Sequence, residues 1–363
     1  MKDEDLQKDS KITELEVRLR DTEKQLTETR KERALLGVLS ETLAGILPKL
    51  GTHKPLPIKA VTKDAIDETA LLVISDIHGD QTIAPKRVQN LESYNFNAAC
   101  HRAARIADTT ISHLRENLTL YKFKEVVVMM AGDLVSGEIH RATQHSAWQN
   151  SFKNALGVGE MLAFMFIDML KYFNLRVISV SGNHGRRSIK KDYRGSHDNW
   201  DYLVMMHVRT RLQNYIDEGR LTIELPEAYT VGVQIEGWNF ILNHFDDIKS
   251  YQQIPWYGIE RKTRRFAALG GLTGVTPHYF VGGHFHNFAT QQHTLGEIII
   301  NGKWPATDEY ALESLGACGE PFQMLAGVHK KHGLSWRMPI RIRDRDWKKT
   351  EVKPARYQVR LFD

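Results

Sequence analysis

The sequence contains very little cysteine, and its charge is not strongly of one sign. Its 363 residues include two cysteines, Cys100 and Cys318, and no Cys-x-x-Cys pair. We therefore expect neither a disulfide framework nor a thiolate zinc site, and a reducing compartment is the default. The formal net charge of +5 is compatible with a polyanionic partner but is modest for a protein that coats DNA.

Long apolar runs are also absent. The most apolar stretch, residues 161–173, is short and contains Asp168 and Lys171. It therefore predicts a buried helix and not a membrane span. The opening residues, MKDEDLQKDSK, mix both charges and lack the apolar centre of a signal peptide. We expect a cytoplasmic protein that does not associate with membranes.

Residues 1–47 predict an amphipathic helix that extends from the N-terminus of the fold. Its apolar seam follows heptad spacing at Ile12, Leu15, Leu19, Thr22, Leu26 and Thr29. Two interpretations stay open: a short coiled coil that forms a homo-oligomer, or a single helix that packs on its own domain or frays. Residues 48–69 contain prolines and predict a linker. A domain over residues 70–335 and a basic C-terminal segment over residues 336–363 complete the predicted organisation.

From residue 70 onward, short apolar runs recur, and each is typical of a buried strand. They cover residues 71–75, 126–131, 177–181, 240–243 and 279–282, and helical stretches at 97–117 and 146–172 separate the first three. This alternation predicts an α/β fold with helices packed on the sheet faces. Ligands of open α/β sheets bind beyond the carboxyl ends of strands, so chemistry is expected directly after these runs.

Each of the five runs is followed by residues of the kind that bind metal ions. They are Asp76-Ile77-His78, Gly132-Asp133, Gly182-Asn183-His184, His244 and Gly283-His284-Phe285-His286. One histidine at a strand end is usually structural, but five such endings in one chain are not expected by chance. Aspartate, histidine and asparagine without cysteine form an oxygen and nitrogen ligand set for Mn, Fe, Zn or Mg. The glycines at 132, 182 and 283 allow the backbone to come close to the ions.

The order of these motifs resembles that of the calcineurin-like metallophosphoesterases, over roughly residues 70–290. The rest of the chain is similar to phage-encoded members, which would place the protein in a host cytoplasm. Among the branches of the family, the arrangement of the motifs is most similar to that of the repair exonucleases. The resemblance implies a four-layer α/β fold, in which two mixed β-sheets pack as a sandwich flanked by helices. It also implies two divalent metal ions, with Mn²⁺ expected first and Fe, Zn or Mg as alternatives.

The resemblance implies a role for each motif residue. One metal ion would be bound by Asp76, His78 and His286, and the second by Asn183, His244 and His284. Asp133 would bridge both ions, opposite a bridging hydroxide. His184 would be the catalytic histidine, which stabilises charge on the phosphoryl group or protonates the leaving oxygen.

Two motif positions depart from the family pattern. Gly185 stands where the third motif usually has Glu or Asp, so an acidic group near the second metal is missing. Ser136, Gly137 and Glu138 stand where Ser/Thr protein phosphatases have Asp-Arg-Gly. The absence of that arginine counts against a protein phosphatase.

Basic residues follow two of the motifs. Arg186, Arg187, Lys190 and Arg194 come soon after His184, and Arg261, Arg264 and Arg265 follow Trp256 and Tyr257. Cations beside aromatic rings fit a nucleic-acid backbone, although a charged outer helix face is an equally ordinary explanation. We expect a phosphodiesterase that acts on DNA as a nuclease or exonuclease. A phosphodiesterase or phosphatase for a small nucleotide is the alternative, and a protein phosphatase or a vestigial assembly module are lesser ones.

Overall fold

A computed structural model gives the fold of this chain. The structure describes residues 11, 15–16, 18–23, 37–39, 41–43, 45, 47–56, 65–139, 142–249, 254–293, 296–359 and 361–362. The chain divides into two compact units, residues 1–47 and residues 48–363. The second unit contains both sheets and the residues predicted to carry chemistry.

The first sheet has six strands in the order β11-β10-β1-β2-β3-β4. The strands β1 to β4 run parallel to one another, whereas β10 and β11 are antiparallel to their neighbours. Their bounds are β1 (Ile66–Ile74), β2 (Tyr121–Met130), β3 (Asn174–Ser179), β4 (Leu221–Glu224), β10 (Phe322–His329) and β11 (Gly333–Arg341). The first three predicted apolar runs are therefore the strands β1, β2 and β3.

The second sheet has five strands in the order β5-β6-β7-β9-β8. The strands β6, β7 and β9 are parallel, and the edge strands β5 and β8 are antiparallel to them. Their bounds are β5 (Thr230–Ile235), β6 (Trp238–Asn243), β7 (Tyr279–Gly282), β8 (Ala289–His293) and β9 (Gly296–Ile300). The two remaining apolar runs are strands β6 and β7 of this sheet.

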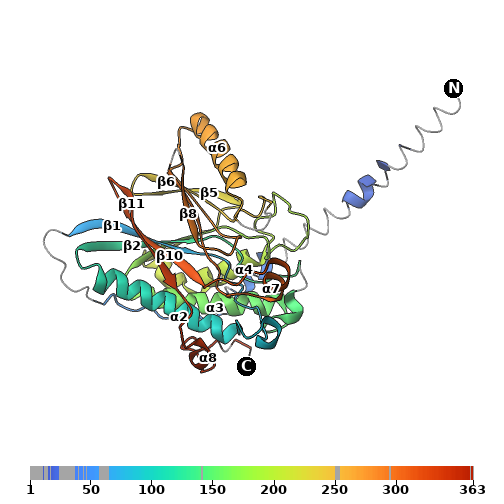
Figure 1. Cartoon of the computed structure of the whole chain (residues 1–363), viewed down its shortest axis with the longest axis horizontal. Coiled ribbons are helices and arrows are strands. Elements are labelled where there is room, and N and C mark those ends of the chain that lie inside the picture. Colours follow the sequence, from blue (N-terminus) through green and yellow to red (C-terminus); the bar gives the residue numbers. More distant parts are fainter. Residues whose placement is uncertain are drawn as a thin grey trace. The chain divides into compact units, whose positions relative to one another are not determined.

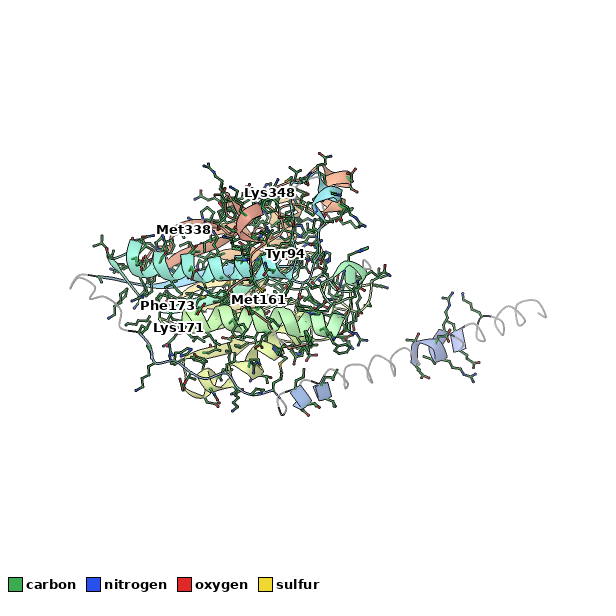
Figure 2. All side chains as sticks on the ribbon, turned by 90° about the horizontal axis from the view of Figure 1, so that it is seen from below. Tyr94, Met161, Lys171, Phe173, Met338 and Lys348 are labelled. Carbon is green, nitrogen blue, oxygen red and sulfur yellow. The ribbon has the colours of Figure 1, made fainter. Side chains whose placement is uncertain are left out.

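Helices cover the outer faces of the two sheets (Figure 1). The first sheet carries α2 (Phe96–Ser112), α3 (Ser151–Leu170) and α4 (Trp200–Arg211), and the second carries α6 (Trp256–Thr273). Figure 2 shows α2 and α3 running side by side, with Met161 on α3. The shorter elements are η1 (Pro85–Val88), η2 (His113–Asn117), η3 (Ala142–His145), α5 (Gln213–Asp217), α7 (Glu309–Leu315) and α8 (Trp347–Thr350).

An apolar core fills the space between the two sheets. It includes Leu71, Val73, Val127, Met129 and Ile178 of the first sheet and Val233, Phe240, Leu242, Val281 and Ile299 of the second. A second cluster, Phe245, Ile259, Phe280, Ile298 and Ile300, joins α6 to the other face of the second sheet. The predicted four-layer α/β fold is confirmed, because two mixed sheets form a sandwich with helices outside each.

The three helices on the first sheet begin in the same way. Each has an asparagine at its N-cap in an extended conformation, and the side-chain oxygen accepts a backbone N–H of the first turn. The caps are Asn95, Asn150 and Asn199. The last of these places the start of α4 close to the end of β3, because Trp200 N donates to Gly185 O at 2.7 Å.

The segment predicted as a linker, residues 48–69, belongs in part to the folded unit. Leu50 N donates to Arg211 O at 3.1 Å, and Leu56 N donates to Lys171 O at 2.8 Å. The strand β1 begins at Ile66, four positions before the predicted start of the domain. The described part of this segment is therefore bound to the domain, and its last residues are a sheet strand.

Residues 336–363, predicted as a separate basic segment, also belong to the fold. The first six of them lie in β11. Farther on, Glu351 accepts hydrogen bonds from Arg102 Nε at 3.0 Å and Nη2 at 2.9 Å. Arg102 is fully buried on α2 and also pairs with Glu92 at 3.0 Å. The C-terminal segment therefore neutralises a charge in the interior.

The described residues of the first unit do not test whether it forms a coiled coil, so the coiled coil stays a prediction. Its described residues are helical, with Leu15 57% and Leu19 60% exposed. The seam residues Ile12, Leu26 and Thr29 lie outside the described residues. None of the helices in the described part of the chain combines the length and apolar character that crossing a bilayer requires.

Candidate metal centre

The five motif segments meet at one place. The parallel strands β1, β2 and β3 end at the same edge of their sheet, and β6 and β7 are parallel in the other. Three groups of side chains have ligand atoms within 4.8 Å of one another: Asp76, His78 and His286; His78, Asp133 and His184; and Asp133, His244 and His284. Neighbouring groups share His78 or Asp133, so residues far apart in sequence form one cluster.

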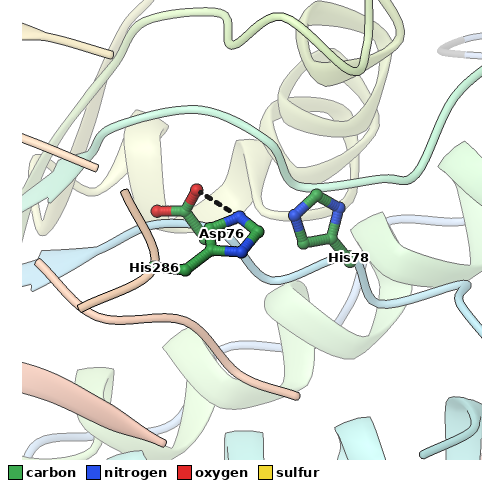
Figure 3. Close-up of side chains that lie close together, drawn as sticks. All are labelled: Asp76, His78 and His286. Atoms are coloured by element: carbon green, nitrogen blue, oxygen red, sulfur yellow. Dashed lines mark ion pairs between the residues drawn. The ribbon is translucent and has the colours of Figure 1, made fainter. Parts of the chain in front are cut away.

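Asp76, His78 and His286 form the first group (Figure 3). His286 Nε2 lies 3.4 Å from Asp76 Oδ1, and the centroids of the His78 and His286 rings are 5.4 Å apart. Both carboxylate oxygens of Asp76 accept the backbone N–H of His284, at 3.0 and 3.1 Å. The loop after β7 therefore holds the carboxylate that follows β1.

His244 organises the second group. Its Nδ1 contacts Ala131 O at 2.7 Å, which leaves Nε2 facing the cluster. That atom lies 2.9 Å from Asp133 Oδ2 and 3.0 Å from Asn183 Oδ1. The ring of His284 is 5.2 Å from the ring of His244, measured between centroids. An oxygen and nitrogen ligand set is therefore assembled around this histidine, as the sequence predicted.

The predicted catalytic residue, His184, lies beside both groups. Its backbone N–H donates to Asp133 Oδ1 at 2.8 Å, and its ring centroid is 4.7 Å from that of His78. Its Nδ1 lies 3.3 Å from Ser136 O. The side chain is only partly buried, so it stands between the buried cluster and the surface.

Buried polar atoms in the cluster fit bound cations. His78 Nε2 is buried and forms no hydrogen bond with a described residue, and the buried Asp133 Oδ2 has its close contact with His244 Nε2 at 2.9 Å. Buried polar atoms without a hydrogen bond are rare in folded proteins and call for a ligand. Carboxylate oxygen, amide oxygen and imidazole nitrogen together suit divalent metal ions. The residues present therefore fit a divalent metal centre, and the assignment of each ligand to one of two ions stays a prediction.

The backbone at this site is strained. Ten of the described residues other than glycine have left-handed φ angles, and five of the ten are Asp76, His78, Asp133, His284 and His286, between 43° and 72°. This conformation costs free energy for residues with a Cβ and persists only when the surrounding structure enforces it. Five of the seven predicted metal ligands therefore occupy an unfavourable conformation, as is common at functional sites.

The backbones of Gly132, Gly182 and Gly283 pack closely against their neighbours, while their approach to the ions stays a prediction. Gly132 has φ of +89°, and a Cβ there would lie 2.5 Å from Gly182 N. A Cβ at Gly182 would lie 2.2 Å from Asp133 Oδ1, and one at Gly283 would lie 2.3 Å from Asp76 Oδ2. Only glycine therefore lets these loops pack against the carboxylates.

One carboxylate that holds the site together was not predicted from the sequence. Asp201, in the first turn of α4, is buried and accepts the backbone N–H groups of Asp133 at 2.8 Å, Leu134 at 2.9 Å and Gly182 at 2.9 Å. It thereby joins the loop after β2 to the loop after β3. Burial and the charge of Asp133 raise the pKa of Asp201 to about 6, against the effect of these N–H groups. The sequence offered one signal, a helix start at Asn199, but that signal does not reveal the partners.

The first residues of α4 and its cap, Asn199 and Asp201, explain why position 185 is glycine. A Cβ on Gly185 would lie 2.0 Å from Asn199 Oδ1 and 3.0 Å from Asp201 N. No acidic side chain fits there while α4 starts at this point. The motif that lacks an acidic residue at 185 therefore receives a carboxylate from the helix that follows.

The protonation states of the three buried histidines differ. Burial lowers the pKa of His78 to about 3 and that of His284 to about 4. Burial also disfavours the charged form of His244, but the carboxylate of Asp133 outweighs it and raises the pKa of His244 to about 10. Without metal, His244 is therefore protonated at neutral pH and the other two are not.

The predicted substrate contacts occupy two environments. Arg186 lies 3.7 Å from Asp246 and Arg187 lies 3.5 Å from Asp198, so both take part in ion pairs. Lys190 and Arg194 are exposed. Lys191 pairs with Asp246 as well, at 2.6 Å. Asp246 follows His244 by two positions and anchors this basic loop beside the cluster. The contact of the loop's basic residues with a substrate stays a prediction.

Comparison with known proteins gives distant structural likeness. Neither a protein-family model nor a curated protein sequence matches this chain. Similar solved structures include an archaeal phosphodiesterase (11% identity, TM-score 0.32, 74% of this chain and 99% of that chain). Vps29 from Entamoeba histolytica complexed with Zn²⁺ has 11% identity and a TM-score of 0.33, over 75% and 99%. A hypothetical protein of Pyrococcus horikoshii has 13% identity and a TM-score of 0.37, over 77% and 91%. What this chain does must follow from its own residues.

Replacing Asp201 is expected to destabilise the site. In Asp201→Ala, four backbone N–H groups, those of Asp133, Leu134, Val135 and Gly182, lose their acceptor. The free energy of unfolding should fall by about 3 kcal/mol or more. Urea denaturation of the metal-free protein measures this, and metal titration should show weaker binding in parallel. Asp217→Ala, which removes an exposed carboxylate from α5, should change stability by less than about 0.5 kcal/mol. Equal stability of the two variants would refute the role of Asp201.

Metal binding is expected to release a proton from His244. The ring must be neutral to bind a metal through Nε2, and its pKa of about 10 means that it starts protonated. This group should raise the apparent metal affinity by about tenfold per pH unit between roughly pH 7 and 9. Calorimetry in buffers of different ionisation enthalpy should detect about one proton from this histidine. His244→Asn should release one proton fewer, and identical release in both proteins would contradict the prediction.

Proposed function

We propose that this chain hydrolyses phosphodiester bonds with two divalent metal ions, because the order of its motifs resembles that of the calcineurin-like metallophosphoesterases. The convergence of five strand ends into one buried cluster of Asp, His and Asn carries this proposal. The cluster contains no thiolate, so its ligands suit Mn²⁺ first, and Fe, Zn or Mg after it. A vestigial module would have no reason to keep five ligands in a strained backbone.

The arrangement of the side chains defines what each contributes. Divalent cations, when bound, polarise a phosphoryl oxygen and lower the pKa of water. Asp133 belongs to two of the three groups, which supports a role in holding both ions. The Nδ1–H of His184 is directed at Ser136 O. When Nε2 carries a proton as well, the ring is an imidazolium. It can donate this proton to the leaving oxygen of the ester as the P–O bond breaks.

The environment of His184 argues against a protein phosphatase. Gly137 occupies the position of the arginine of that class, and a Cβ there would lie 1.8 Å from His184 O. No arginine fits at this position without moving the catalytic loop. The phosphate group must therefore be held by other cations.

Nucleic acid is the substrate that we propose, and α6 provides the supporting surface. Tyr257, Arg261 and Arg265 are spaced four residues apart, so they share one face of the helix. All three are exposed, with the Tyr257 side chain at 80%. They line two adjoining hollows of about 420 and 360 Å³ that share both arginines. An aromatic ring in line with cations suits single-stranded nucleic acid, whose bases stack while its phosphates are neutralised.

The position of α6 ties this surface to the cluster. Phe245 comes directly after His244 and packs with Ile259 of α6. Lys262 donates to Asn243 Oδ1 at 2.9 Å and to Asp247 Oδ1 at 2.6 Å. One of the hollows is lined by the loop that follows His244, through Asp247, Ile248 and Lys249. A nucleic-acid strand that lies along α6 would therefore pass beside the residues that follow His244.

A small-nucleotide phosphodiesterase is the second candidate. The observation in its favour is that Arg186 and Lys191 are both paired with Asp246 next to the cluster. The ion pairs with Asp246 hold these two cations close to the cluster. This position suits a short substrate bound close to the metal ions. This alternative does not use the basic face of α6.

The metal-dependent activity has a direct test. Metal-stripped protein reconstituted with Mn²⁺ should cleave bis-p-nitrophenyl phosphate and DNA. His184→Ala should keep its metal but lose about 10²-fold or more in turnover, whereas Asp133→Asn should lose metal and activity together. Equal metal content in Asp133→Asn and wild type would refute the bridging role. Cleavage of the small diester with DNA left intact would favour the small-nucleotide alternative.

The role of α6 has its own test. Arg261→Gln with Arg265→Gln should weaken binding of single-stranded DNA and lower the slope of log affinity against log salt by about 1.4, two cations at roughly 0.7 each. Lys330→Gln with Lys331→Gln removes the same charge from the turn between β10 and β11, at the opposite sheet edge. Hydrolysis of bis-p-nitrophenyl phosphate should be unchanged in both. An unaltered salt slope in the α6 variant would exclude this surface.

A further inference from the structure

A short segment outside the five motifs runs between the two loops of the first metal group. Asn301 N donates to Gly282 O at 2.7 Å, and Trp304 N donates to Asp76 O at 3.0 Å. Between them, Gly302 O accepts Ser75 Oγ at 3.2 Å. Residues 301–304 are therefore fixed to the end of β1 and to the end of β7 at once.

This segment places a buried lysine beside the cluster. Lys303 is only 4% exposed, yet no described residue forms a hydrogen bond or an ion pair with its ammonium group. Burial lowers the pKa of Lys303, and the carboxylates of Asp308, Asp76 and Glu92 act on it from beyond ion-pair distance. A lysine side chain that is almost entirely buried loses much of its hydration, and an anion bound close to its ammonium group would offset that cost.

The three surrounding carboxylates are already engaged with other groups. Asp76 pairs with His286, and Glu92 pairs with Arg102 at 3.0 Å and with Arg343 at 3.7 Å. Asp308 caps α7 by accepting Ala311 N at 2.7 Å. Each carboxylate thus has its own closer donor. The ammonium of Lys303 remains available for an anion that the chain does not supply.

Asp308 interacts electrostatically with both Lys303 and His286. Burial raises the pKa of Asp308 and its bond to Ala311 N lowers it, and the charges of Lys303 and His286 lower it further. Asp308 is therefore a common neighbour of the lysine and of a predicted metal ligand. Lys303 lies beside the first group because its neighbours Gly302 and Trp304 are hydrogen-bonded to Ser75 and Asp76.

We propose that Lys303 is the phosphate-binding cation of this site and contacts a non-bridging oxygen of the phosphoryl group that is hydrolysed. This inference rests on the proposed function, because it takes the cluster as the place where the ester binds. It supplies the cation that Gly137 cannot. Its charge would neutralise an oxygen that gains negative charge as water attacks phosphorus. No motif residue is needed for this role, and no proton has to move at the lysine.

The test compares Lys303→Met with wild type, both loaded with Mn²⁺. The inhibition constant for inorganic phosphate should rise about tenfold, and kcat/KM for bis-p-nitrophenyl phosphate should fall by about 10- to 100-fold. Metal content should stay the same. Lys331→Met, which removes a lysine from the distant β10–β11 turn, should leave both quantities within twofold of wild type. Unchanged phosphate inhibition in Lys303→Met would overturn the proposal and leave Lys303 as a counter-charge for Asp76 and Asp308.

Further variants keep the test decisive if Lys303→Met does not fold. Lys303→Arg keeps the charge, and Lys303→Gln keeps only a polar end. Stronger phosphate binding by the arginine variant supports the proposal, and equal binding by the two overturns it. Phosphate binding is measured by calorimetry without turnover. A wild type that binds phosphate through Lys303 but hydrolyses no ester would refute the proposed function and not this inference.

Discussion

The carboxylate of Asp201 is the contact on which the rest of the site depends. It gathers backbone N–H groups from the ends of two neighbouring strands, where the positive ends of the peptide units would otherwise face each other. With these groups neutralised, Gly132 and Gly182 can come into contact and Asp133 can turn toward His244. The asparagine cap at Asn199 sets the position of this carboxylate, so the start of one helix determines the shape of the cluster.

Strain and ligation are coupled at the same residues. Asp76 and His78 take left-handed backbone angles directly after β1, and His284 and His286 do so directly after β7. These turns direct the side chains of Asp76 and His78, and of His284 and His286, into the cluster beyond the ends of the strands. The hydrogen bonds from His284 N to Asp76 connect the two turns. The free energy that the backbone loses is offset by packing and by the ions that the cluster is built to receive.

The sequence was sufficient for the parts of this molecule whose signal is local. Five apolar runs marked five central strands, and metal-type residues after each run marked the cluster that the structure assembles. Contacts between segments far apart in the chain could not be predicted from the sequence. Asp201 binds backbone N–H groups, which every residue possesses, so no side-chain pattern announces it. Lys303 has the sequence appearance of an ordinary surface lysine, and only the anchoring of Asn301 and Trp304 buries it. The extent of β1 and the docking of Glu351 on Arg102 were missed for the same reason.

The position of β10 has a consequence for how the chain is made. The strand β1 pairs on one side with β2, which follows soon after it, and on the other side with β10, which comes near the end of the chain. During synthesis, the open edge of β1 has no partner until β10 has left the ribosome. An unpaired strand edge beside apolar side chains invites association with other chains. One edge of the first sheet therefore stays open to association throughout most of translation, and its exposure ends only when β10 pairs with β1.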